Sequence, residues 1–409
     1  MKTYSPIEYL CIDIANNFGL DKELFSTRIQ WVKDNYNKLE ELESEATEDA
    51  VQYKKSVMAL RSVVRGEETG HLISLDSTCS GIQILSAITG CKAGARITNL
   101  MPIEQRFDAY TEITRSMNNI LRDQGKLDFN VSRSDAKDAV MKGVYGSKAE
   151  PRNIFGDGPL LDMFYQACFK EAPGAYGLLD VLTNVWQPNA LAHSWNMPDN
   201  FHVQVKVMQT KETRIEVDEL DHHQFVCQYK VNEGTPFGVS LVANTTHSID
   251  AYILRTLIRR TSMNRILVKE CLHLLEGVAK GTKYTPCDEL NELFQLTTQT
   301  NIVDPVWFTL INKTNIKNIP YVLAQRLIGL GTKMLSHKAY DLLTVHDAFR
   351  QHANYCQNTR YWYAEILAEL AESKILENIV SQITDTYTPF RKYSNDLGNL
   401  IRQSDYAIC

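Results

Sequence analysis

The stretch RSDAKDAVMKGVYGSK, at residues 133–148, constrains this chain more than any other. As a helix, it places Arg133, Lys137 and Tyr145 at multiples of four residues, so two cations and an aromatic ring share one face. The free N–H groups and positive dipole of a helix start also favour an anion. The face is typical of a site for a polyphosphate and a sugar, although an exposed basic face above core residues has the same spacing. Gly146 either lets a base or backbone approach closely or ends the helix.

Two β-favouring runs that end in a carboxylate flank this stretch. Residues 71–83 read HLISLDSTCSGIQ and contain Asp76, and residues 342–349 read LLTVHDAF and contain Asp347. An aspartate at a strand end is common turn chemistry, so neither run is decisive alone. If the two runs pair, the carboxylates meet and repel each other unless a cation neutralises them. Oxygen ligands suit magnesium, and two ions about 3.5–4 Å apart are the usual device for displacement at phosphorus.

The order of these segments resembles the single-subunit RNA polymerases of T-odd (T-seven-like) bacteriophages and mitochondria. DSTCSGIQ at residues 76–83 is similar to that family's first palm motif, residues 133–146 to its fingers helix, and VHDAF at residues 345–349 to its second palm motif. Further similar segments are NNFGLDK at residues 16–22, HSID at residues 247–250 and SDYAIC at residues 404–409. The similar segments span the chain from end to end.

The resemblance implies an α+β right-hand polymerase, with an antiparallel palm sheet and mostly helical fingers. It assigns the catalytic roles to Asp76, Asp347, Lys137 and Tyr145. Two Mg²⁺ ions would be bound by Asp76 and Asp347, with help from the Ser77 carbonyl. Lys137 would protonate the departing pyrophosphate.

The resemblance also implies a site for a ribonucleoside triphosphate. Lys22, Arg133 and Lys137 would hold the phosphates, while Tyr145 and His247 would read the ribose 2′-hydroxyl. The remaining substrate-binding residues are Tyr110, which would line the nucleotide pocket, Gly81, Gly146 and His346. The carboxylate of Cys409 would lie near the reacting atoms.

The same resemblance divides the chain into palm, fingers and palm. The first palm part is residues 1–104, the fingers are residues 105–246, and the second palm part, with a C-terminal foot, is residues 247–409. The spacing of the second part predicts a helical insertion at about residues 251–340. Alternation at residues 203–241 predicts a hairpin region, either a loop that reads promoter or template or an ordinary β-ribbon. His222 and His223 lie there without partner ligands and are interpreted as surface residues.

Apolar spacing predicts helices over residues 1–64, 99–123, 251–275 and 360–383. The acidic run at residues 40–48 is interpreted as a solvated helix face or loop. Between residues 251 and 275 lies a basic stripe that either follows a phosphate backbone or is a solvated face. Its members are Arg255, Arg259, Arg260, Arg265 and Lys269. Asp138 stands where several family members have a second basic residue, and it is positioned to pair with Lys142.

Family members carry an N-terminal domain, a thumb and the first palm strands ahead of the segment that resembles NNFGLDK, which begins here at Asn16. We therefore expect a second, smaller polypeptide to supply these parts. The arrangement resembles the larger subunit of the two-chain RNA polymerase II of N-four-type phages. The expected partners are a DNA template, an RNA product, ribonucleoside triphosphates and that second chain, with no membrane.

The composition fits a large folded protein in a reducing compartment. The 409 residues are 44% apolar and carry a net charge of −6, which does not exclude a basic channel within an acidic exterior. Nine cysteines occur without a C-x-x-C pair, so free thiols are expected rather than disulfides or structural zinc. No apolar run reaches about 18 residues. We expect the protein in the cytoplasm of a bacterial host.

Two other functions use the same features. A family A DNA polymerase shares the order carboxylate, K…YG helix and HD, but such enzymes place a glutamate where Gly81 stands and an acidic residue where Ala348 stands. Both differences favour ribonucleotides. A catalytically idle scaffold that binds nucleic acid is the other alternative, although such a scaffold has no need for paired metal ligands.

Overall fold

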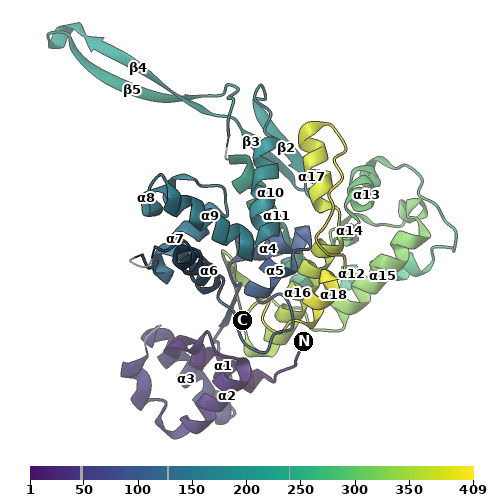
Figure 1. The fold of residues 1–409 in the computed structure, drawn as a ribbon. Helices are drawn as coiled ribbons and strands as arrows, with labels where there is room; N and C mark the ends of the chain where they lie inside the picture. The colour runs from purple at the N-terminus through teal and green to yellow at the C-terminus, as the bar shows by residue number, and fades with distance from the viewer. Residues whose placement is uncertain (47–48, 127–128, 239) are drawn as a thin grey trace.

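A computed structural model describes residues 1–46, 49–126, 129–238 and 240–409 (Figure 1). The protein is a mixture of α-helices and small antiparallel sheets, which confirms the predicted combination of helix and sheet. Residues 41–45 form a short 3₁₀ helix in which Glu41 and Glu45 are exposed, whereas residues 47–48 of the predicted acidic run lie outside the described residues. Within the described residues, no helix combines the length and apolar character needed to cross a membrane.

A three-stranded antiparallel sheet joins the two ends of the chain. It contains β1 (Ile73–Asp76), β6 (Leu343–Val345) and β7 (Ala348–Gln351), in the order β1-β7-β6. Asp76 lies opposite Ala348, so the predicted pairing of the two carboxylate-bearing runs is present. The strand that follows the His346–Asp347 turn makes this pairing, and the strand before the turn lies at the edge.

Three helices form an N-terminal unit, drawn in purple at the bottom of Figure 1, as predicted for residues 1–64. They are α1 (Pro6–Ala15), α2 (Phe25–Asp34) and α3 (Ala50–Val64). Ser5 and Glu8 form a capping box that fixes the start of α1. After α1 the chain makes a π-helical turn, Asn16–Leu20, in which Gly19 adopts a φ of 111°. Such a φ favours glycine, so NNFGL has a local structural reason for its glycine.

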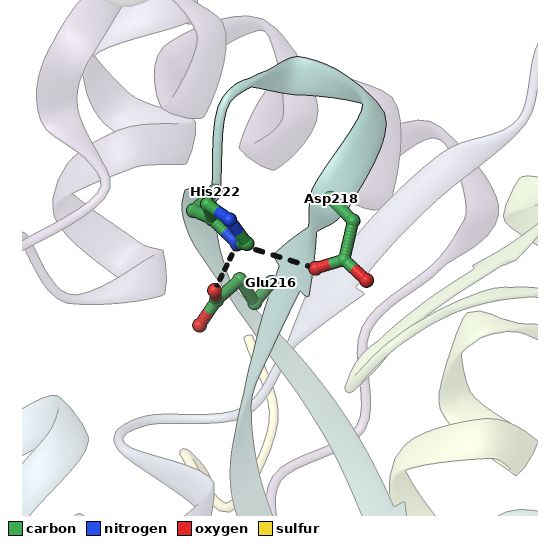
Figure 2. A group of neighbouring side chains, drawn as sticks. All are labelled: Glu216, Asp218 and His222. Atoms are coloured by element: carbon green, nitrogen blue, oxygen red, sulfur yellow. Dashed lines mark ion pairs between the residues drawn. The ribbon is translucent and has the colours of Figure 1, made fainter.

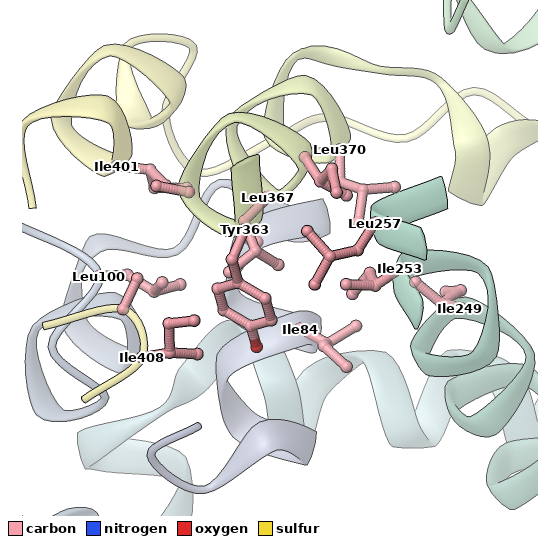
Figure 3. Packing of buried hydrophobic residues seen from close by; sticks show 14 of the residues in the cluster. Ile84, Leu100, Ile249, Ile253, Leu257, Tyr363, Leu367, Leu370, Ile401 and Ile408 are labelled. Atoms are coloured by element: carbon pink, nitrogen blue, oxygen red, sulfur yellow. The ribbon is translucent and has the colours of Figure 1, made fainter. Parts of the chain in front are cut away.

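The central core lies between helices that come from distant parts of the sequence. These are α4 (Ser80–Thr89), α5 (Lys92–Ile97), α11 (Ser240–Ser262), α16 (Cys356–Glu372) and α18 (Leu397–Gln403). Figure 3 shows Tyr363 among buried aliphatic side chains of this core. Its hydroxyl donates to Gln83 Oε1 at 2.7 Å, and Gln83 Nε2 donates to the carbonyls of Thr98 and Ala407. Gln83 therefore ties the first turn of α4, which begins four residues after Asp76, to α16 and to the C-terminal segment.

Five helices pack beside the core on the side of the predicted fingers. They are α6 (Ala109–Asp123), α7 (Arg133–Gly143), α8 (Ala149–Phe155), α9 (Pro159–Glu171) and α10 (Pro173–Asn184). The predicted helix over residues 99–123 begins only at Ala109, because Asp108 caps it and Asn99 binds the Phe107 backbone. The predicted helix over residues 133–148 also ends early, at Gly143.

Two β-ribbons follow α10. The shorter ribbon pairs β2 (Ala192–Asn196) with β3 (His202–Lys206), and the longer pairs β4 (Gln209–Val217) with β5 (His223–Val231). The predicted hairpin region is thus present in its described residues. Figure 1 shows the β4–β5 ribbon projecting far from the helical body. Phe225 and Tyr229 on this ribbon are about half exposed, at 52% and 45%, so the alternation there does not mark a buried face.

The remaining helices form a lobe at the other side of the core. They are α12 (Arg265–Glu276), α13 (Asp288–Thr300), α14 (Trp307–Leu310), α15 (Tyr321–Leu335) and α17 (Ile375–Thr384). The prediction of a single helix over residues 251–275 is wrong. Helix α11 begins earlier and ends at Ser262, and a second helix, α12, begins after Asn264, whose side chain caps it. The single helix predicted over residues 360–383 is also two helices, α16 and α17, separated at Ser373 and Lys374.

The predicted basic stripe falls on α11 and α12, and most of its members are neither free for a phosphate backbone nor part of a solvated face. Arg255 and Arg259 both bind the buried carboxylate of Asp199, at 2.7 and 2.6 Å. Arg259 also binds Asp304, and the buried Arg260 pairs with Glu369 of α16. The remaining members are Arg265, which donates to the Leu335 carbonyl, and Lys269, which is exposed. Most of the stripe therefore fixes helices to one another.

Candidate active site

A cavity of about 800 Å³ lies between the N-terminal helices, the three-stranded sheet and helices α6 and α7. Its walls bring together residues that are far apart in the sequence. The predicted site residues that line it are Lys22, Asp76, Ser77, Gly81, Tyr110, Arg133, Lys137, Tyr145 and Asp347. Cys409 also lines it, as predicted for the end of the chain, whereas Gly146, His247 and His346 do not.

The two predicted metal ligands are neighbours on the floor of the cavity. Burial, and then the nearby charge of Asp347, raise the pKa of Asp76 to about 6. Ser77 Oγ donates to Asp347 Oδ2 at 2.8 Å, so the hydroxyl of Ser77 contacts the carboxylate in addition to any role of its carbonyl. Crowded carboxylates of this kind, in an otherwise polar cavity, fit a hard divalent cation such as Mg²⁺.

A third carboxylate, Asp250 on α11, belongs to this cluster and was missed from the sequence. Burial and the charge of Asp347 raise the pKa of Asp250 to about 6, while His346 partly offsets the shift. HSID at residues 247–250 contains it, so the sequence signal was its place directly before the helix predicted from residue 251, which in the structure begins at Ser240.

Backbone geometry fixes the position of Asp347. His346 and Asp347 form a two-residue loop between β6 and β7, and His346 adopts a φ of 54°. A histidine with this φ is uncommon and is held by the surrounding pairs. On the opposite edge of β1, Cys409 N–H donates to the Asp76 carbonyl at 3.0 Å. The C-terminal segment thus supports the strand end that presents Asp76.

Helices α6 and α7 supply a cationic wall. Arg133 forms an ion pair with Asp108, and its guanidinium lies 5.6 Å from the centre of the Tyr110 ring. Although burial opposes it, the Arg133 guanidinium lowers the pKa of Asp108. Lys137, one turn further along α7, is exposed to the cavity. Asp108 was missed as a partner of Arg133 because the two residues lie on different helices.

The expected pairing of Asp138 with Lys142 is not formed, because Lys142 binds Glu150 at 2.9 Å. That carboxylate lies at the start of α8, which packs against α7. The contact joins α8 to the last turn of α7.

Tyr145 lies just after α7, where it meets two other predicted residues. The rings of Tyr145 and His247 lie 4.7 Å apart between centroids. A Cβ added to Gly81 would lie 2.8 Å from Val144 Cγ1 and 3.3 Å from Tyr145 Cζ. The space over Gly81 is therefore filled by the residues that end α7.

Gly146 ends the helix, which decides between the two interpretations of its role. It adopts a φ of 86°, and Ser147 N–H donates to the Lys142 carbonyl while Gly146 N–H donates to the Gly143 carbonyl. These two bonds form a Schellman motif with Gly146 at its left-handed position. The motif leaves Tyr145 at the cap, where its ring is directed to the cavity.

The NNFGLDK segment is held by two arginines that were not predicted. The buried Arg28 donates to the carbonyls of Asp21 and Glu23 and to Asn16. Arg106 also donates to the Asp21 carbonyl. These bonds fix the loop that presents Lys22 to the cavity, although Lys22 is paired with the Asp21 carboxylate.

A separate cluster lies at the tip of the β4–β5 ribbon. His222 Nδ1 lies 2.6 Å from Glu216 Oε1 and 3.3 Å from Asp218 Oδ1, as Figure 2 shows. The sequence interpretation that His222 lacks partner groups is therefore wrong, whereas its surface position is correct. Among the described residues this is the only group of three such side chains close enough for one ion, and all three are exposed.

Comparison with known proteins identifies the relatives of the N-terminal third. Residues 3–150 match the family of DNA-dependent RNA polymerases. The matched range contains Lys22, Asp76 and the whole of α7, whereas His247 and Asp347 lie outside it.

Two known proteins have sequences similar to parts of this chain. The chain is 26% identical over 162 residues to the mitochondrial DNA-directed RNA polymerase of Schizosaccharomyces pombe, which is 34% of this chain and 14% of the relative. It is also 26% identical over 109 residues to a DNA-directed RNA polymerase of Pseudomonas phage phiKMV, which is 23% of this chain and 13% of the relative. The chain therefore aligns with only about one seventh of each relative's length.

Proposed function

We propose that this chain is the catalytic chain of a DNA-directed RNA polymerase. One observation carries the proposal: a single cavity holds two neighbouring carboxylates, Asp76 and Asp347, opposite the cationic helix that bears Arg133 and Lys137. Phosphoryl transfer requires this combination, because negative charge builds on the phosphate oxygens during displacement. The sequence match over residues 3–150 supports the same chemistry.

Asp76 and Asp347 would hold two Mg²⁺ ions, which activate the attacking oxygen and stabilise the leaving oxygen. The 3′-hydroxyl oxygen of the growing RNA would bond to the α-phosphorus of the incoming ribonucleoside triphosphate, its proton would pass to water, and the bond from that phosphorus to pyrophosphate would break. Arg133 and Lys22 exchange their partners Asp108 and Asp21 for phosphate oxygens. Lys137 Nζ then donates a proton to the departing pyrophosphate.

The ribose is recognised by the neighbouring rings of Tyr145 and His247. The packing over Gly81 supports this assignment, because Tyr145 can pack there only when residue 81 has no side chain. In this proposal the sheet and its central helices are the palm, helices α6–α10 belong to the fingers, and helices α12–α15 are an insertion.

We further propose that a second polypeptide completes the enzyme on its DNA template. Among the described residues, β6 pairs only with β7, so its outer edge offers backbone groups to another strand. Leu343 and Val345 on this strand are 52% and 45% exposed, and Met58 of α3 lies with Leu343 on one groove. An apolar strand of the companion chain fits this edge.

Template-dependent incorporation of ribonucleotides and deoxyribonucleotides, with Mg²⁺, tests the proposal. The full-length chain is measured alone and with the polypeptide encoded beside it. Ribonucleotide incorporation on a DNA template is the expected result. A preference for deoxyribonucleotides favours the DNA polymerase, and template binding without synthesis in every pairing favours the idle scaffold.

A further inference from the structure

The cations that line the cavity differ in whether they have partners. Lys22 and Arg133 form ion pairs, and Arg106 donates to a backbone carbonyl. Among the lysines and arginines of the cavity wall in the described parts of the chain, Lys137 and Arg350 have no side-chain hydrogen bond or ion pair. Lys137 already has a role in the proposed chemistry, whereas Arg350 has none.

Arg350 lies on the floor of the cavity, on the same sheet as the carboxylates. It occupies β7, the central strand, opposite Ser74 of β1. Ser74 and Asp76 are two residues apart on one strand, so they share a face and lie about 6.6 Å apart along it. Both line the cavity with Arg350, so this arginine lies on the same sheet and in the same cavity as the carboxylate pair.

The guanidinium of Arg350 is half-buried and incompletely satisfied. Its Nε is buried without a hydrogen-bond partner. The charge of Arg350 acts on the Asp13 carboxylate, but that carboxylate already binds His71 at 2.7 Å. Leaving a buried hydrogen-bond donor without an acceptor costs free energy, which a ligand with an acceptor would recover. The planar guanidinium fits a phosphate through two parallel hydrogen bonds.

We propose that Arg350 binds a backbone phosphate of the RNA product, next to the reacting 3′ end. The inference rests on the proposed function, because it takes the carboxylate pair as the place where the 3′ end reacts. The incoming triphosphate is served by the cations of α7, on another wall. The strand that delivers the 3′ end extends away from that wall, over Asp76 and then over Ser74 and Arg350.

The test measures binding rather than synthesis. An RNA primer annealed to a fluorescent DNA template is titrated with the full-length chain in Mg²⁺ without nucleotides, and affinity is read by anisotropy over a range of salt. Arg350→Gln is expected to weaken binding about tenfold and to reduce the salt slope by about 1. Arg350→Lys should keep most of the salt slope. Arg122→Gln, an exposed arginine of α6 outside the cavity, is the matched control.

Neutral methylphosphonate linkages locate the contact. Replacing the RNA phosphate nearest the 3′ end should weaken binding to the parent chain by about the same factor as Arg350→Gln and cause no further loss in that variant. The same replacements in the DNA template should act independently of Arg350. The inference is wrong if the loss of affinity from a methylphosphonate at every RNA position multiplies with the loss from Arg350→Gln. It is also wrong if only replacements in the DNA template depend on Arg350.

Two further measurements keep the conclusions separate. Melting curves show whether each variant folds. If Arg350→Gln does not fold, the parent chain alone decides: equal affinity for every methylphosphonate primer overturns the inference. Ribonucleotide incorporation is assayed with the same primers. If binding depends on Arg350 at one RNA position but no ribonucleotide is incorporated, the polymerase function is refuted and the RNA contact stands. If ribonucleotides are incorporated but binding shows no such dependence, the polymerase function stands and the RNA contact is refuted.

Discussion

Tyr145 and His247 lie with their ring centroids 4.7 Å apart and their planes inclined by 33°, although one follows the end of α7 and the other comes from the middle of α11. The contact joins the cationic helix to the helix that carries Asp250. It places two hydrogen-bonding rings beside the carboxylate cluster, where a ribose must lie in the proposed reaction.

Tyr145→Phe should reduce the preference for ribonucleotides over deoxyribonucleotides by about tenfold, because one hydrogen bond to the 2′-hydroxyl is lost. The measurement is kcat/KM for each nucleotide on one template. His247→Ala should have a similar effect, and the double variant should be little worse than either. Tyr165→Phe, on α9 away from the cavity, is the control, and an unchanged preference in Tyr145→Phe would contradict the ribose assignment.

Gly81→Ala should destabilise the protein by about 1–3 kcal/mol and lower incorporation, because the new Cβ meets Val144 at 2.8 Å and displaces Tyr145. Urea unfolding and nucleotide kinetics measure the two effects. Gly329→Ala on α15 is matched, since no atom lies within 4 Å of its added Cβ. That variant should be unchanged or more stable by about 0.5–1 kcal/mol. Equal results for the two glycines would show that the contact over Gly81 is unimportant.

Asp347→Asn should lower synthesis about a thousandfold while leaving hybrid binding nearly intact, because a metal ligand is lost but the cationic wall remains. Single-turnover primer extension and anisotropy measure the two properties. Asp341→Asn removes the same charge from an exposed position shortly before β6 and should change neither. An Asp347→Asn variant with ordinary synthesis would exclude the proposed mechanism.

Stability should depend on pH and Mg²⁺ together. Asp76 and Asp250 have pKa values of about 6 in the folded protein, above the unfolded value of about 4. Their contribution to metal-free stability is therefore fully present below about pH 4 and is lost as the pH rises through about 6. Mg²⁺ binds the ionised carboxylates, so the melting temperature should rise on adding Mg²⁺ at about pH 8 and hardly change at about pH 5. Asp76→Asn should lose most of this difference in a calorimetric comparison.

Arg260→Ala should destabilise the protein by about 3–5 kcal/mol, because it leaves Glu369 without its partner in the core. The salt dependence of nucleic-acid binding should stay the same, since this side chain is buried. Lys269→Ala, on the exposed side of α12, should change the free energy of unfolding by less than about 0.5 kcal/mol. A reduced salt slope in Arg260→Ala would instead restore the interpretation of the stripe as a phosphate-binding surface.

Local chemistry was readable from the sequence because it depends on residues a few positions apart. The strand that ends at Asp76, the His346–Asp347 turn and the helical spacing of Arg133 and Lys137 are of this kind, and the structure contains each of them. Errors occurred at element ends. Gly146 permits either a close approach or a helix end, and only the two bonds from Gly146 and Ser147 to the last turn of α7 decided between them.

The partners of the buried charges were decided by the tertiary structure alone. Arg259 and Asp304 are separated by 45 positions and Arg260 and Glu369 by 109, so no local pattern distinguishes these buried pairs from a basic surface. The same is true of Arg350, which is an ordinary strand residue in the sequence and an unpaired cation beside the carboxylates in the fold. The sequence by itself determined which charged groups are available, and packing decided which of them neutralise one another and which remain free for a ligand, because burial and distance control that choice.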